Sequence, residues 1–167
     1  DDHGRAGDQL EQPSEPLSGE VEADETYMGG YKKGMQGGRG KTPILGLVQR
    51  GGEVRVKVAP RDKHLVLGHM IENVEKGTRV LTDQYGAYKL ARKLGYGHGS
   101  VNHHKKEYAR GMVHTNTIEG FWGQLKRSIR GTYGFVSPQH LQAYANEFAF
   151  RYSNRNRSIF DVLLRRI

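Results

Sequence analysis

His114-Thr-Asn-Thr-Ile-Glu-Gly-Phe-Trp-Gly-Gln-Leu-Lys126 is the stretch around which the rest of this chain is organised. Apolar residues recur there with the spacing of one helix face, at positions 118, 121, 122, 125 and 129. A neighbouring stripe, about a third of a turn away, carries Asn116, Glu119, Gly123, Lys126 and Arg130. We therefore expect a helix over 115–130 that packs one face on a core and presents a carboxylate with a lysine two turns further on. By itself, the pattern also fits a surface helix with an ordinary pair of opposite charges.

The charge of the chain is strongly uneven. The 167 residues carry a net charge of +8, of which residues 1–20 contribute −5 and the rest therefore +13. From Lys105 onward, eleven Lys and Arg residues face only four acids. A domain this basic attracts a polyanion, most often a nucleic acid, although simple solubility is an alternative. A membrane surface fits less well, because the basic residues are spread over several elements without a strongly apolar face.

Composition excludes several classes of protein. The sequence has no apolar run of about 18 residues and so no membrane span, and it opens without the basic and apolar segments of a signal peptide. Cysteine is absent, which excludes disulfides and thiolate metal sites and fits the reducing cytoplasm. Residues 1–20 are polar and rich in Gly, Pro and acids, so we expect a disordered tail or linker remnant followed by one domain over 21–167. The start without Met suggests a fragment or a processed chain.

The remaining patterns predict a mixed α/β fold. Strands are predicted over 21–27, 44–49, 54–59, 79–83 and 100–102, and helices over 64–75, 87–94, 115–130 and 138–153. Gly51-Gly52 marks a hairpin turn, and Ser137 with Pro138 marks a helix start. A short apolar anchor is expected in the basic tail, from Ile159, Phe160, Leu163 and Leu164. Sequential strands followed by alternating strands and helices indicate a ribonuclease H-like mixed sheet flanked by helices.

Three acids lie where this layout would place a site. Asp24 is in the middle of the first strand, Asp83 is at the carboxyl end of the fourth, and Glu119 is on the helix. Three neighbouring carboxylates repel one another unless a divalent cation lies between them, and oxygen ligands suit magnesium or manganese. Two such ions, about 3.5–4 Å apart, would serve a phosphoryl transfer. Two alternatives remain open: Glu25 instead of Asp24 faces the site, or Asp83 merely begins a turn.

Motifs around these acids resemble those of a known family. Val-Glu-Ala-Asp-Glu-Thr-Tyr occupies 21–27, Asp-Gln-Tyr-Gly-Ala-Tyr occupies 83–88, and His-Thr-Asn-Thr-Ile-Glu-Gly-Phe-Trp occupies 114–122. A lysine follows Glu119 by seven residues, and 148–156 resembles a C-terminal block. In these respects the chain, from residue 21 to about 164, resembles the DDE-type transposases of bacterial insertion sequences.

The resemblance implies cutting and joining of DNA at transposon ends. Water would attack a phosphodiester first, and the freed 3′-hydroxyl would then attack target DNA. Asp24, Asp83 and Glu119 would bind two Mg²⁺ or Mn²⁺ ions, Lys126 would contact DNA near the cleavage site, and Asn116 would be a further site residue. A homo-oligomer on DNA, in the bacterial cytoplasm at the nucleoid, is implied as well.

Further basic residues are expected to contact the DNA backbone. They are Lys105, Lys106 and Arg110 in a loop, with Lys126, Arg127 and Arg130 on the helix. His98, His103, His104 and His114 lie close in sequence, but they lack the spacing of a helical His pair and no cysteine supports a zinc site. We expect His114 to contact phosphate or to orient Glu119 through Asn116.

Two other functions remain possible on these residues. One is a ribonuclease H-like nuclease that hydrolyses but does not join, and the other is a non-catalytic basic module that binds nucleic acid. The resemblance also has a gap, because such transposases usually carry an N-terminal DNA-binding region. Residues 1–20 are too short to form one, so we expect it to be encoded elsewhere or the chain to be truncated.

Overall fold

The computed structural model describes residues 15–29, 41–60, 62–82, 88–100, 114–132, 134 and 136–164. The strands are β1 (Glu20–Met28), β2 (Thr42–Gln49), β3 (Val54–Val58), β4 (Arg79–Thr82) and β5 (Gly97–Ser100). The helices are α2 (Lys63–Asn73), the 3₁₀ helix η1 (Tyr88–Leu94), α3 (Asn116–Thr132), α4 (Pro138–Ser153) and α5 (Ile159–Leu164). No helix in these ranges is long and apolar enough to cross a membrane.

One mixed sheet is formed by the strands, in the order β3-β2-β1-β4-β5. The first three strands pair antiparallel, and β4 and β5 extend the sheet parallel to β1 on its other side. The predicted turn at Gly51 is confirmed, since Gly51 has a φ of 72° there. Parallel neighbours need a crossover, which α2 supplies between β3 and β4, and η1 lies between β4 and β5. This order confirms the predicted ribonuclease H-like mixed sheet.

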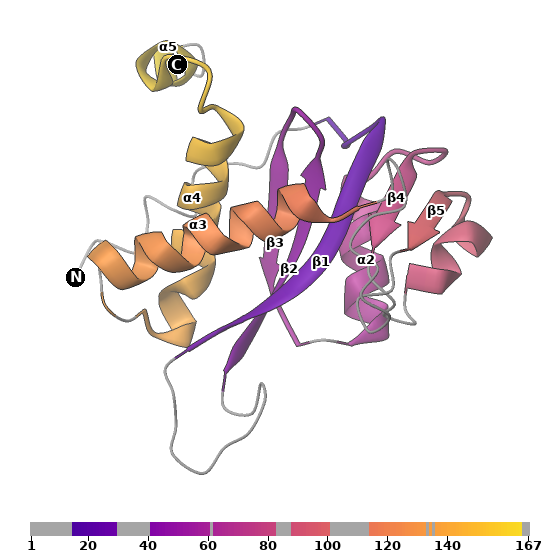
Figure 1. Ribbon diagram of the computed structural model, residues 1–167, viewed down its shortest axis with the longest axis horizontal. Coiled ribbons are helices and arrows are strands. Elements are labelled where there is room, and N and C mark those ends of the chain that lie inside the picture. The colour runs from indigo at the N-terminus through magenta and orange to yellow at the C-terminus, as the bar shows by residue number, and fades with distance from the viewer. Residues whose placement is uncertain are drawn as a thin grey trace.

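Helices cover both faces of the sheet (Figure 1). Helices α3 and α4 pack on one face and α2 on the other. Strand β1 divides its side chains between the two layers, as a period of two requires. Val21 and Ala23 belong to the core under α2, whereas Glu22 and Asp24 contact α3. The central strand therefore presents acids to the α3 side and apolar groups to the other.

Two predicted elements take a different form. The expected helix over 87–94 is the 3₁₀ helix η1, a short segment that stops at Gly95, where φ is 90°. The expected strand over 100–102 is β5, which begins at Gly97, three residues earlier. Glycines at 97 and 99 have low strand propensity, so the local sequence did not indicate that the strand starts at Gly97. Backbone pairing with β4 stabilises the strand there.

The ends of the chain also differ from expectation. Leu17 is only 1% exposed and forms a bridge with Val74, so the packed body begins before the expected boundary at Val21. A disordered tail or linker stays a prediction for residues 1–14, which lie outside the described part. In the tail, Phe160 is 70% and Leu164 is 52% exposed, so these two residues do not form the expected apolar anchor.

Candidate active site

Strand β1 presents Asp24, half-buried, to helix α3. Its Oδ2 accepts a hydrogen bond from Trp122 Nε1 at 3.2 Å. Glu25 has the opposite orientation, because its register partner Leu45 belongs to the core under α2. Of the two neighbouring acids that the sequence left open, Asp24 is the one on the α3 face.

A glycine makes room for the indole that holds Asp24. Gly46 is the antiparallel register partner of Asp24 on β2. A Cβ at Gly46 would lie 2.4 Å from Trp122 Cζ2, which is far inside van der Waals contact. Glycine at this strand position therefore permits the close approach of the ring. The predicted core role of Trp122 is confirmed, since it is 5% exposed, and its Nε1 adds a polar function that the sequence analysis missed.

Glu119 lies in the first turn of α3 with its side chain exposed. Its Oε1 accepts a hydrogen bond from Thr115 Oγ1 at 3.0 Å, and its backbone N donates to the carbonyl of Thr115 at 3.1 Å. Thr115 is 2% exposed, so a buried hydroxyl orients this carboxylate. The backbone N of Asn116 lies 3.4 Å from His114 Nδ1, while the Asn116 side chain is exposed. A site role for the Asn116 side chain stays a prediction.

Lys126 lines a basic pocket of about 390 Å³ beyond Asp24. Lys41 and Arg130 line it as well, together with apolar groups of β1, α3 and α4 that include Met28, Ile129 and Leu141. Burial, and then the charges of Lys41 and Arg130, lower the pKa of Lys126, whereas the Asp24 carboxylate acts in the opposite direction. The positive charges of Lys41, Lys126 and Arg130 repel one another here, so the pocket favours an anion.

Several predicted site residues lie outside the described part of the chain. They are Asp83, Lys105, Lys106 and Arg110. Strand β4 ends at Thr82, whose parallel register partner is Ala23, the residue before Asp24. Among the described residues, no group of three His, Asp or Glu side chains is close enough to hold a metal ion. Arg127 is exposed on α3.

The largest omission of the sequence analysis is Glu22. This carboxylate is completely buried and accepts a hydrogen bond from the backbone N of Ile118 at 2.9 Å. The available signal was its position two residues before Asp24, which places both acids on one face of the strand. His114 was expected to contact phosphate or to orient Glu119 through Asn116, and its Nδ1 lies 3.2 Å from Glu22 Oε1 and 3.4 Å from the backbone N of Asn116.

The described donors fit a hard divalent cation. Asp24 and Glu119 supply carboxylate oxygens, the ligands that magnesium and manganese prefer. Each carboxylate is oriented by a hydrogen bond from a group of α3 or its N-terminal flank, Trp122 Nε1 and Thr115 Oγ1 respectively. Partners of this kind orient metal ligands in proteins.

Solved structures align with this chain at low sequence identity. The catalytic core domain of HTLV-2 integrase, solved with magnesium in a dimeric form, aligns with a TM-score of 0.47 and 13% identity over 81% of this chain and 85% of that chain. A chain of the simian T-cell lymphotropic virus intasome, solved with PP2A regulatory subunit B56 gamma, aligns with a TM-score of 0.42 and 12% identity over 79% and 49%. Among curated proteins, no sequence matches significantly.

The family model of the ISXO2-like transposase domain matches residues 16–153. The match includes β1 with Asp24, the end of β4, and α3 with Glu119 and Lys126. A match over most of the chain shows the family, so this protein belongs to the ISXO2-like transposases, and its described body is a DDE transposase catalytic domain, a polynucleotidyl transferase.

Proposed function

We propose that Asp24, Asp83 and Glu119 together bind divalent metal, two Mg²⁺ or Mn²⁺ ions, for cleavage and joining of DNA strands. The observation that carries the proposal is that α3 ties Asp24 and Glu119 into one unit, through Trp122 and Thr115. Asp83 follows Thr82 in the sequence as Asp24 follows Ala23, and Thr82 and Ala23 are register partners. When bound, two such ions supply activation of an attacking oxygen and stabilisation of a leaving oxygen.

The protein's own residues would then bind and orient the DNA. The basic pocket of Lys41, Lys126 and Arg130 would take a backbone phosphate next to the scissile one. Lys126 lines this pocket, and the Asp24 carboxylate raises its pKa against the larger effects of burial and neighbouring cations. Lysine at this position would hold the reacting strand, so that water and later a 3′-hydroxyl meet the phosphorus in line.

The wider DNA contacts are proposed from charge. Arg127 is exposed on α3, and Lys105, Lys106 and Arg110 are close to α3 in sequence. Contacts of this kind contribute salt-dependent affinity rather than base recognition. Joining two transposon ends requires that both be held together, so we propose a homo-oligomer on DNA, in the bacterial cytoplasm.

Calorimetric titration with MnCl₂ tests the metal site. Asp24→Asn and Asp83→Asn are both expected to weaken Mn²⁺ binding by about 10-fold or more, because each removes a charged oxygen ligand. Glu25→Gln is the matched control, since it removes one charge from the neighbouring residue on the opposite face of β1. Equal affinity of wild type and both Asp variants would instead support a non-catalytic basic module.

A joining assay separates a transposase from a nuclease that only hydrolyses. A labelled DNA oligonucleotide with a free 3′-hydroxyl is incubated with supercoiled plasmid, the protein and Mn²⁺. Covalent transfer of the label to the plasmid, lost in Asp24→Asn, is the expected result. Nicking of the plasmid without transfer of the label would support the nuclease.

A further inference from the structure

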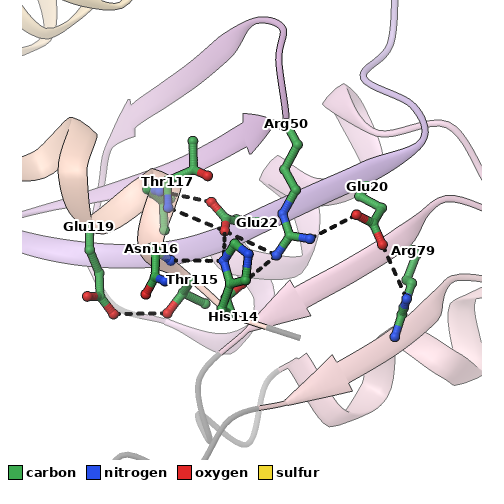
Figure 2. A network of polar contacts seen from close by, with 10 residues as sticks. Glu20, Glu22, Arg50, Arg79, His114, Thr115, Asn116, Thr117 and Glu119 are labelled. Atoms are coloured by element: carbon green, nitrogen blue, oxygen red, sulfur yellow. Dashed lines mark hydrogen bonds and ion pairs between the residues drawn. The ribbon is translucent and has the colours of Figure 1, made fainter. Parts of the chain in front are cut away.

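Glu22 is a charged side chain with no exposed surface, at the centre of a polar network that joins β1 to α3 (Figure 2). Its Oε2 accepts from the backbone N of Ile118 at 2.9 Å, and its Oε1 accepts from the backbone N of Thr117 at 3.4 Å. Arg50 Nη2 and His114 Nδ1 lie 3.4 and 3.2 Å from Oε1. Burying a carboxylate is costly unless hydrogen bonds and opposite charge surround it, and here both do.

The contact with α3 is a helix cap supplied from another element. Helix α3 begins at Asn116, so the N–H groups of Thr117 and Ile118 belong to its first turn and lack partners within the helix. A carboxylate at this end is also favoured by the partial positive charge of the helix N-terminus. Glu22 therefore fixes the point on β1 at which the helix begins.

A second contact fixes the rotation of the helix about its axis. Trp122 Nε1 donates to Asp24, two residues along β1 from Glu22 and four residues along α3 from Ile118. Two strand residues advance about 6.6 Å and four helix residues about 6 Å, so the two contacts are in step along the two elements. Glu119 lies between Ile118 and Trp122 in sequence. Its position relative to Asp24 therefore depends on both contacts.

Arg50 strengthens the first contact from the hairpin. Its Nη2 donates to the carbonyl of His114 at 3.0 Å, and its Nη1 donates to Glu20 Oε2 at 2.8 Å. The guanidinium thus links Glu20 of β1 to the backbone of His114, two residues before the start of α3, as Figure 2 shows. Glu20 binds Arg50 and Arg79, whereas Glu22 binds Arg50 and the first turn of α3.

We propose that Glu22 is a positioning residue of the active site, which sets the separation of the Asp24 and Glu119 carboxylates through the N-terminus of α3. This inference rests on the proposed metal site. Glu22 is not a ligand itself, because its oxygens are buried against helix N–H groups. A slip of α3 by one residue would turn Glu119 by about 100° and move it about 1.5 Å. The cap opposes that slip.

The test compares Glu22→Gln with Glu20→Gln. Both variants remove one negative charge from β1 and from the surroundings of Arg50, but only Glu22 caps α3. Mn²⁺ affinity is measured by calorimetry on protein shown to be folded by circular dichroism, and amide hydrogen exchange at Thr117 and Ile118 is measured without metal. We expect Glu22→Gln to weaken Mn²⁺ binding about 10–100-fold and to speed exchange at both amides, with Glu20→Gln within about twofold of wild type.

Other results would overturn the inference. A folded Glu22→Gln with wild-type Mn²⁺ affinity, or equal losses in both variants, would show that the carboxylate does not position the site. If Glu22→Gln does not fold, Glu22→Asp replaces it with Glu20→Asp as its control, because Asp keeps the charge and withdraws it by one methylene. Glu22→Asp is then expected to weaken Mn²⁺ binding more than Glu20→Asp, and equal affinities of the two variants would overturn the inference. Wild-type protein that binds no Mn²⁺ would remove the proposed metal site and this inference together.

Discussion

Single side chains decide how the carboxylates of the site are held. Asp24 and Glu119 were proposed as site residues from their predicted positions on a strand and a helix and from the motifs around them. Trp122 Nε1 and Thr115 Oγ1, which orient them, were not, because helix periodicity indicates that a residue is buried but not which polar atom of another element it meets. Burial, and then the charges of Lys41 and Arg130, lower the pKa of Lys126, and these neighbouring cations make an anion favourable there.

Replacing Lys126 by Ala tests its place at the DNA. Strand joining is expected to fall about 100-fold, because one positive contact to the reacting phosphate is lost. Mn²⁺ affinity is expected to stay near that of wild type, since Lys126 is not a ligand. Lys126→Arg keeps the charge and should retain more joining activity than Lys126→Ala. Equal loss of joining and of metal binding in Lys126→Ala would contradict the proposed placement.

His69 makes stability depend on pH. Burial lowers the pKa of His69 from 6.5 to about 4, so the unfolded chain binds a proton between these pH values and the folded chain does not. The free energy of unfolding therefore falls as pH falls from about 6.5 to about 4, by up to about 3 kcal/mol from this residue. Urea titrations at several pH values should show a shallower decline in His69→Gln. An unchanged slope would show that His69 is not responsible.

Among the elements, the pair of β1 and α3 carries Asp24 and Glu119 of the proposed site. The apolar positions predicted for α3 are the residues that the structure buries: Ile118, Phe121, Trp122, Leu125 and Ile129. The alternation along β1 correctly divided its residues between two faces of the sheet. It did not show which of the two faces α3 covers. Packing against the whole sheet decides that choice. The same limit hid Glu22, whose partners are backbone groups 95 and 96 residues away.

Gly46→Ala tests the packing of α3 on β2. A methyl group at Gly46 would overlap the Trp122 ring, so we expect a loss of about 1–3 kcal/mol in the free energy of unfolding. Gly68→Ala is the control in α2, where an added Cβ meets nothing within 4 Å. There we expect a gain of about 0.5–1 kcal/mol, because Ala favours the helix. Urea unfolding measures both, and a neutral Gly46→Ala would contradict the close approach of Trp122.

The molecule as a whole is strongly basic, with a net charge of +8. Net charge already indicated a nucleic acid partner, and the strand order then confirmed the fold that the element pattern predicted. Local sequence placed the start of strand β5 three residues too late and indicated no role for Leu17, because both depend on pairing with distant segments. Element existence was readable from the chain, and lateral contacts were not.

Salt dependence of DNA binding tests how the charge is used. Lys41→Ala and Arg130→Ala are each expected to reduce the slope of log affinity against log salt by about 0.9, the value for one neutralised phosphate on B-DNA. Lys57→Ala is the control, because Lys57 pairs with Glu72 of α2, on the other face of the sheet. Fluorescence anisotropy at several salt concentrations gives the slopes. A slope that changes equally in all three variants would show that DNA does not select the basic pocket.

The gathering of three distant carboxylates into one metal site is tested most directly by a crystal structure of the protein grown with MnCl₂. Anomalous scattering locates Mn²⁺ independently of the protein atoms. We predict anomalous peaks for Mn²⁺ ions bound by Asp24, Asp83 and Glu119. The metal–oxygen distances should be close to those of Mg²⁺ sites, about 2.1 Å. Manganese bound elsewhere, or an ordered Asp83 directed away from Asp24 and Glu119, would contradict the proposed chemistry.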